Sequence, residues 1–214
     1  MGNKVTELVF ILDKSGSMSG KEADTIGGFN SMIEKQKQLE GKVVVSTILF
    51  SNYSEVLHDR KNLDEVGVLT EKDYRTYGCT ALLDAVGNAI NHIDKVHRSL
   101  KKKDIPEQTI FVITTDGMEN ASREYTSTLV KKMIQEHEKE NGWDFLFLAA
   151  NIDAVETAEY IGIRAERAAN YSLRKTEKMY DVLSDAICYS RINREIASDW
   201  SKDIKVGVVE EEHK

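Results

Sequence analysis

The sequence predicts an α/β fold: a doubly wound, Rossmann-like arrangement of three layers, with helices on both faces of a mostly parallel sheet of about six strands. Apolar runs of strand length alternate with segments of helical periodicity along nearly the whole chain. One apolar strand is followed, after a short turn, by a more polar one, which predicts one antiparallel edge strand. The chain has 214 residues, 41% of them hydrophobic, enough for one core. We therefore expect one domain at 1–200 and a polar C-terminal tail at 201–214.

The hydrophobic pattern directly predicts the first strand and helix. Residues 7–12, ELVFIL, are almost wholly apolar and predict a buried strand. Residues 21–40 predict a helix, and the residues that share its inward face are Ile26, Phe29, Met32, Ile33 and Gln36. Gly27 and Gly28 each cost this helix roughly 1 kcal/mol relative to alanine. Close backbone packing on the sheet, or a helix that moves, would account for them.

The next units continue the alternation. Residues 42–50 form a second apolar strand, and 54–60 is its expected hairpin partner at an edge of the sheet. Residues 80–100 predict a helix that begins with a threonine and has its apolar side chains at Leu82, Leu83, Val86, Ile90 and Ile93. The only proline, Pro106, then leads into a strand at 108–115.

The last third repeats the pattern. Residues 127–141 predict a helix that ends at an Asn-Gly pair, and 143–150 predict a strand. A short helix at 153–162, a short strand at 167–172 and a closing helix at 176–196 complete the unit. Because strands alternate with helices, the sheet should be largely parallel and covered on both faces.

Composition excludes several classes of protein. With 29 Lys and Arg against 36 Asp and Glu, the net charge is -7, which argues against nucleic acid or an anionic membrane as the main partner. The N-terminal apolar run is too short for a signal peptide, and we expect no membrane span. The two cysteines, Cys79 and Cys188, are far apart, which favours a reducing compartment, so we expect a cytoplasmic protein. The sequence does not indicate an oligomeric state.

Small oxygen-bearing side chains follow the predicted strands at three points. Asp13, Ser15 and Ser17 come directly after the first strand, Thr80 precedes the central helix, and Asp116 follows the strand at 108–115. Loops after parallel strands meet at one edge of the sheet, so we expect these five residues to converge. Hydroxyl and carboxylate oxygens suit Mg²⁺ or Mn²⁺. Neutral hydroxyls would leave much of the cation's charge uncompensated, so an outside carboxylate would be attracted.

These segments resemble the metal-ion-dependent adhesion site of von Willebrand factor A (vWA) domains. DKSGS matches the D-x-S-x-S motif of that family, GCTAL contains its threonine and ITTDG contains its second aspartate. The resemblance extends from the first strand to the last helix. It implies that Asp13, Ser15, Ser17, Thr80 and Asp116 bind Mg²⁺ or Mn²⁺, with the aspartates acting directly or through water. It also implies a non-enzymatic, stand-alone module of bacterial type whose protein partner supplies a carboxylate to the metal.

Other interpretations of the first loop fit less well. A phosphate-binding loop would need glycine at Ser15 and a hydroxyl residue at Glu22, and a serine-hydrolase elbow would have methionine at the nucleophile position. An aspartyl phosphatase would have an acid in place of Ser15. Single serines or threonines here could simply cap helices. A metal-dependent phosphoryl-transfer or hydrolytic enzyme, and a regulatory subunit with a structural metal, remain the alternatives.

Neighbouring residues could form the rim that a partner contacts. Glu119, Asn120 and Asn151 are the candidates, whereas Asp153 is better explained as a helix cap. Cys79 is expected to be a small buried residue in its loop. The histidines at 58, 92, 97 and 137 fall on predicted surface helices or an edge strand without metal-like spacing, so none is expected to be a ligand.

Overall fold

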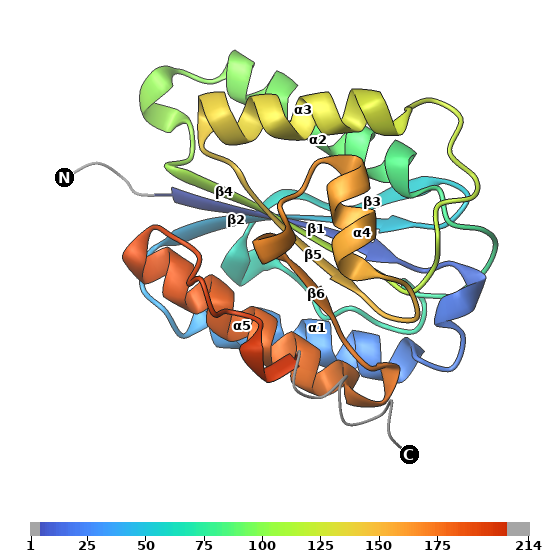
Figure 1. Ribbon diagram of the computed structural model, residues 1–214. Coiled ribbons are helices and arrows are strands. Elements are labelled where there is room, and N and C mark those ends of the chain that lie inside the picture. The colour runs from blue at the N-terminus through green and yellow to red at the C-terminus, as the bar shows by residue number, and fades with distance from the viewer. Residues whose placement is uncertain (1–4, 205–214) are drawn as a thin grey trace.

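A six-stranded sheet forms the centre of the molecule, whose computed structural model describes residues 5–204 (Figure 1). The strands are β1 (Val5–Asp13), β2 (Lys42–Phe50), β3 (Ser54–Asn62), β4 (Gln108–Thr115), β5 (Asp144–Ala149) and β6 (Ala168–Asn170). Their order is β3-β2-β1-β4-β5-β6, and all neighbours are parallel except β3, which pairs antiparallel with β2. The predicted fold class and its antiparallel edge strand are confirmed.

Helices cover both faces of this sheet. They are α1 (Glu22–Lys37), α2 (Leu82–Ser99), α3 (Ser127–Asn141), α4 (Ala154–Ile161) and α5 (Thr176–Asn193). Figure 1 shows α1 and α5 together on one face, with α2 and α3 on the other. Among the described residues, no helix combines the length and apolar character needed to cross a bilayer.

The central strand β1 shows why the sequence folds this way. Leu8, Phe10 and Leu12 belong to the core beneath α1 and α5, whereas Val9 and Ile11 belong to the core beneath α2 and α3. Successive strand side chains point to opposite faces, so a strand covered on both faces needs a continuous apolar run. This arrangement makes β1 a rigid support for the loop that follows Asp13.

Element boundaries differ slightly from the sequence expectation. The helix expected from residue 80 begins at Leu82, so Thr80 lies in the preceding loop. The short strand is limited to Ala168–Asn170, and α5 ends at Asn193, where Arg194 adopts a left-handed φ of 64°. After α5, the side chains of Ile196, Trp200 and Ile204 are buried in the α1/α5 core. The domain boundary at 200 remains a prediction, and 205–214 of the predicted tail lies outside the described residues.

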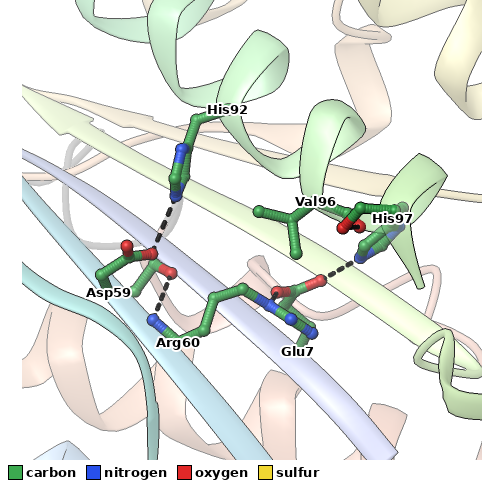
Figure 2. Close-up of polar contacts among 8 residues, drawn as sticks. Glu7, Asp59, Arg60, His92, Val96 and His97 are labelled. Carbon is green, nitrogen blue, oxygen red and sulfur yellow. Dashed lines mark hydrogen bonds and ion pairs between the residues drawn. The ribbon is translucent and has the colours of Figure 1, made fainter.

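The histidines at 58, 92, 97 and 137 lie on the expected edge strand and helices, but two of them, His58 on β3 and His97 on α2, are buried. Glu7, fully buried on β1, places one carboxylate oxygen 2.5 Å from Nε of Arg60 and the other 2.5 Å from Nε2 of His97 (Figure 2). His92 lies on the exposed side of α2, the helix that also contains His97, and its Nε2 is 2.8 Å from Oδ1 of Asp59. The sequence pattern did not show this network, since a single acid at the start of an apolar strand gives no sign of its partners.

Candidate metal centre

Three loops meet at the carboxyl end of the central strands. The amide of Gly16, in the loop after β1, donates to the carbonyl of Gly78, 3.0 Å away in the segment before α2. The amide of Asn120, in the loop after β4, donates to the carbonyl of Thr80 at 3.0 Å. The backbone therefore joins the three segments that contain the predicted ligands.

Asp13 is buried at the end of β1, and both of its carboxylate oxygens accept hydrogen bonds from the protein. Oδ1 accepts from the amide of Ser15 at 2.7 Å, and Oδ2 accepts from the hydroxyl of Thr115 at 2.6 Å. The hydroxyl of Tyr74 donates to the Asp13 carbonyl oxygen. These contacts fix the Asp13 carboxylate in one orientation.

Ser15, Ser17 and Asp116 form a short chain of oxygen atoms. The two serine hydroxyl oxygens are 3.0 Å apart, and the Ser17 hydroxyl donates to Oδ1 of Asp116 at 2.5 Å. The second carboxylate oxygen of Asp116, Oδ2, is buried and has no hydrogen-bond partner. A buried carboxylate oxygen without a partner is costly, so this atom is available for a ligand that can compensate its charge.

The Thr80 hydroxyl lies near the Ser17 hydroxyl, with Gly117 between them. A Cβ atom added to Gly117 would lie 2.8 Å from Oγ1 of Thr80 and 3.1 Å from Oγ of Ser17, so only glycine leaves room between the two hydroxyls. The Thr80 amide donates to Oδ1 of Asn120 at 2.9 Å. The structure thus brings all five predicted residues together. Sequence reasoning missed Gly117 and Thr115, although both stand beside Asp116 in the ITTDG segment.

Burial raises the pKa of both acids, and charge repulsion adds to the shift of Asp13. Burial raises the pKa of Asp13, and the nearby Asp116 charge raises it further, although hydrogen bonds from Thr115 and Ser15 oppose this. Burial also raises the pKa of Asp116, against a hydrogen bond from Ser17. Lys14, between Asp13 and Ser15 in sequence, pairs instead with Glu55, Nζ lying 2.6 Å from Oε2. A cation at the site would therefore compensate a negative charge that the neighbouring lysine does not.

The residues present fit a hard divalent cation. Two carboxylates and three hydroxyls supply only oxygen donors, which is the donor set of Mg²⁺ and Mn²⁺ rather than of a thiolate or imidazole site. Within residues 5–204, no group of three or more His, Cys, Asp or Glu side chains is arranged to hold a metal ion. A metal here would therefore depend on the hydroxyls of Ser15, Ser17 and Thr80.

Two of the predicted rim residues hold the loops together. The Glu119 carboxylate accepts hydrogen bonds from the amides of Leu83 and Ala121, both at 2.9 Å, and thereby ties the loop after β4 to the start of α2. Asn120 holds Thr80 from both sides. Asn151 is exposed just after β5 with a left-handed φ of 57°. Contact of these residues with a partner stays a prediction.

Two further expectations concern single residues near the site. Asp153 caps α4 as expected, accepting hydrogen bonds from the amides of Val155 and Glu156 at 2.9 Å each. The expectation that Cys79 is buried was wrong, because its side chain is exposed. The contact that holds this loop comes from the backbone: the Cys79 amide donates to Oδ1 of Asn52 in the β2–β3 turn at 2.7 Å.

Comparison by sequence identifies no relative: no protein-family model and no curated protein matches the chain. Comparison of structures does. The vWF domain of the type V pili tip protein Mfa5 from Porphyromonas gingivalis matches with a TM-score of 0.63 at 10% identity, over 89% of this chain and 97% of that one. The ArnB paralog VWA2 from Sulfolobus acidocaldarius matches with a TM-score of 0.54 at 18% identity, over 87% of this chain and 46% of that one.

A third match is the manganese-loaded TRAP protein of Plasmodium vivax, with a TM-score of 0.54 at 16% identity, over 84% of this chain and 73% of that one. The protein is thus an open α/β domain with an oxygen-rich site at the carboxyl edge of its sheet. Its fold is that of vWA domains. The chain spans less than half the length of several matched structures, 46% for VWA2 and for a mussel byssus matrix protein.

Proposed function

We propose that this chain is a protein-binding module, not an enzyme, that engages its partner through a bound Mg²⁺ or Mn²⁺ ion. The hydroxyls of Ser15, Ser17 and Thr80 would hold the ion, with Asp13 and Asp116 binding directly or through water. The observation that carries the proposal is the buried, unpartnered Oδ2 of Asp116 beside these hydroxyls. The manganese in the TRAP structure of the same fold supports a divalent cation.

The chemistry of the donor set supports a protein partner with a carboxylate. The three hydroxyl ligands are neutral, so aspartates that act partly through water would leave the positive charge of the ion incompletely compensated, and the ion would attract an anionic oxygen from outside. The buried walls of Asp13, Ser15 and Thr80 would restrict water around the ion and strengthen that attraction. An Asp or Glu side chain of a partner is the simplest such ligand. A cytoplasmic location remains part of the proposal.

The environment of Asp13 argues against the phosphoryl-transfer alternative. A nucleophilic aspartate needs one carboxylate oxygen able to attack, and both oxygens of Asp13 accept hydrogen bonds from Ser15 and Thr115. The hydroxyls of Ser15 and Ser17 contact each other, and that of Ser17 donates to Asp116, an arrangement that suits metal ligands better than a nucleophile. We therefore propose binding without turnover.

Calorimetric titration of Mg²⁺ and Mn²⁺ tests the metal site. The double substitution Ser15→Ala with Ser17→Ala should reduce affinity at least tenfold, because two neutral ligands are lost. Ser19→Ala is the matched control, since this exposed serine of the same loop contacts Thr76 and not the acids. Equal affinities in all three proteins would refute the site. Metal-dependent hydrolysis of phosphomonoesters, lost in the double variant, would instead favour the enzyme alternative.

A further inference from the structure

A groove lies beside the candidate metal centre, between the loop after β4 and helix α4. It has a volume of about 470 Å³, and its apolar lining comes from Met118, Ile152 and Tyr160. Met118 is 71% exposed and Tyr160 is 59% exposed, and both line the same groove. Exposed apolar side chains grouped in a concave surface are typical of a binding site.

The groove and the metal centre share one loop and one edge of the sheet. Met118 stands two residues after Asp116, and a Cβ added to Gly117 between them would lie 3.1 Å from the hydroxyl oxygen of Ser17 and 2.8 Å from that of Thr80. The Ala150 amide donates to the Thr115 carbonyl at 3.1 Å, which fixes the end of β5 beside the end of β4. A short peptide segment could therefore reach both places at once.

The groove is acidic as well as apolar. Its lining includes Glu119, Asp153 and Glu156, and no lysine or arginine is among the residues that line it. Hydrogen bonds from backbone amides hold the first two carboxylates, those of Glu119 and Asp153, in fixed positions. Glu156 is exposed on the first turn of α4. The charge of the groove is thus built into the loops and does not depend on mobile side chains alone.

We propose that this groove receives a lysine or arginine side chain of the same partner segment whose carboxylate reaches the metal. The inference rests on the proposed function. A long cationic side chain suits both features of the groove, because its apolar stem packs on Met118 and Ile152 while its charge faces the carboxylates. The Tyr160 ring offers a further contact to the cation. A second acidic side chain would be repelled. The partner motif is therefore an acidic residue followed or preceded closely by a basic one.

Synthetic peptides test this inference without a known partner. The probes are fluorescent six-residue peptides that contain one aspartate and, at each other position in turn, lysine, norleucine or glutamate, titrated with saturating Mg²⁺ and with EDTA. We expect Mg²⁺-dependent binding in which the best lysine peptide binds three- to tenfold tighter than its norleucine counterpart. The glutamate counterpart should bind weakest. Equal binding of all three kinds in Mg²⁺ would overturn the groove inference and leave the metal site intact.

A charge reversal separates the groove from the metal centre. Glu156→Lys should abolish or invert the preference for lysine without changing Mg²⁺ affinity by calorimetry. Glu159→Lys is the matched control, since Glu159 is exposed on the same helix but does not line the groove, and it should keep the preference. An unchanged preference in Glu156→Lys would contradict the inference. Absence of Mg²⁺-dependent binding for every peptide would overturn the partner half of the proposed function, and this inference with it.

Discussion

At the scale of single residues, the two aspartates of the site differ although their sequence contexts look alike. Asp13 accepts hydrogen bonds on both carboxylate oxygens, whereas Asp116 accepts on one and leaves Oδ2 buried without a partner. The motif in the sequence identified both residues but could not assign these environments, because Thr115 and Ser17 reach them only through the fold. Asp13 thus organises the loop, and Asp116 offers an open ligand atom.

Replacement of Asp116 by Asn should stabilise the metal-free protein at neutral pH. Because burial raises the pKa of this carboxyl in the folded state, the folded protein binds the proton more tightly than the unfolded chain does. Its ionised form therefore costs stability increasingly as pH rises from the ordinary aspartate range through the raised pKa. In thermal unfolding in EDTA at pH 7, we expect the free energy of unfolding of Asp116→Asn to exceed that of the wild type by about 1 kcal/mol. Added Mg²⁺ should not stabilise this variant further. A loss of stability in EDTA would contradict this account.

The opposite result is expected at Asp13. An asparagine there would lose the two charge-assisted hydrogen bonds that the carboxylate accepts, and its NH₂ group would face the Thr115 hydroxyl, which would then have to accept and turn its own hydrogen toward the Gly117 carbonyl oxygen. Asp13→Asn should therefore destabilise the metal-free protein by roughly 1–3 kcal/mol, even though a buried charge is removed. Urea unfolding in EDTA measures this difference. Equal effects of the two substitutions would mean that the two carboxylates are not held differently.

Gly117 should be required for metal binding but not for folding. The Cβ of an alanine would force Thr80 Oγ1 and Ser17 Oγ, both at the ends of short side chains, away from their present positions. We expect Gly117→Ala to keep its circular dichroism spectrum and to lose Mg²⁺ affinity at least tenfold. Gly67→Ala, where an added Cβ meets nothing within 4 Å, is the control. Wild-type affinity in Gly117→Ala would show that the gap between the hydroxyls is not needed.

At the scale of elements, the two neighbouring glycines of α1 have different roles. A Cβ on Gly28 would lie 2.1 Å from the Tyr180 ring of α5, whereas a Cβ on Gly27 would meet nothing within 4 Å. The sequence left open whether these glycines reflect packing on the sheet or a mobile helix. For Gly28, the structure gives close packing, but against α5 and not the sheet.

The glycine pair provides a matched test of this packing. Gly27→Ala should stabilise the protein by about 0.5–1 kcal/mol, because alanine favours the helix. Gly28→Ala should destabilise it by about 1–3 kcal/mol, because Tyr180 must leave its place. Chemical denaturation of both variants gives the comparison. The α1/α5 contact would need revision if both variants were stabilised.

The buried network around Glu7 joins β1, β3 and α2 (Figure 2). Arg60→Met should destabilise the protein by about 3 kcal/mol, because it leaves a buried carboxylate with only His97 as partner. Glu7→Gln with Arg60→Met should cost less than the sum of the single changes, since the charge is then removed together with its partner. Strict additivity in this double-mutant cycle would show that the two side chains do not interact energetically.

At the scale of the whole molecule, the sequence predicted the layers and the strand types well because hydrophobic periodicity depends on local burial. The continuous apolar run of β1 indicated a doubly covered strand, and the polar alternation of β3 indicated an edge. Long-range polar contacts were not predictable in this way. The Glu119 carboxylate at the start of α2 and the Lys14–Glu55 pair each join segments far apart in sequence.

The same limit applies to the groove. Met118 and Tyr160 are 42 residues apart, and nothing in either local pattern indicates that they line one surface. The carboxyl edge of the sheet brings together the loop after β4 and helix α4, just as it brings together the oxygen ligands. The strand order of the sheet therefore places the candidate metal centre and the groove side by side at the same edge.

X-ray diffraction from crystals grown with saturating Mn²⁺, recorded near the manganese absorption edge, would locate a bound ion without knowledge of the partner. We expect one anomalous peak within bonding distance of the hydroxyl oxygens of Ser15 and Ser17, next to Thr80 and Asp116. Crystals of the Ser15→Ala, Ser17→Ala protein should lack this peak. No anomalous density at this position in the wild-type crystals, or density only elsewhere on the molecule, would contradict the account.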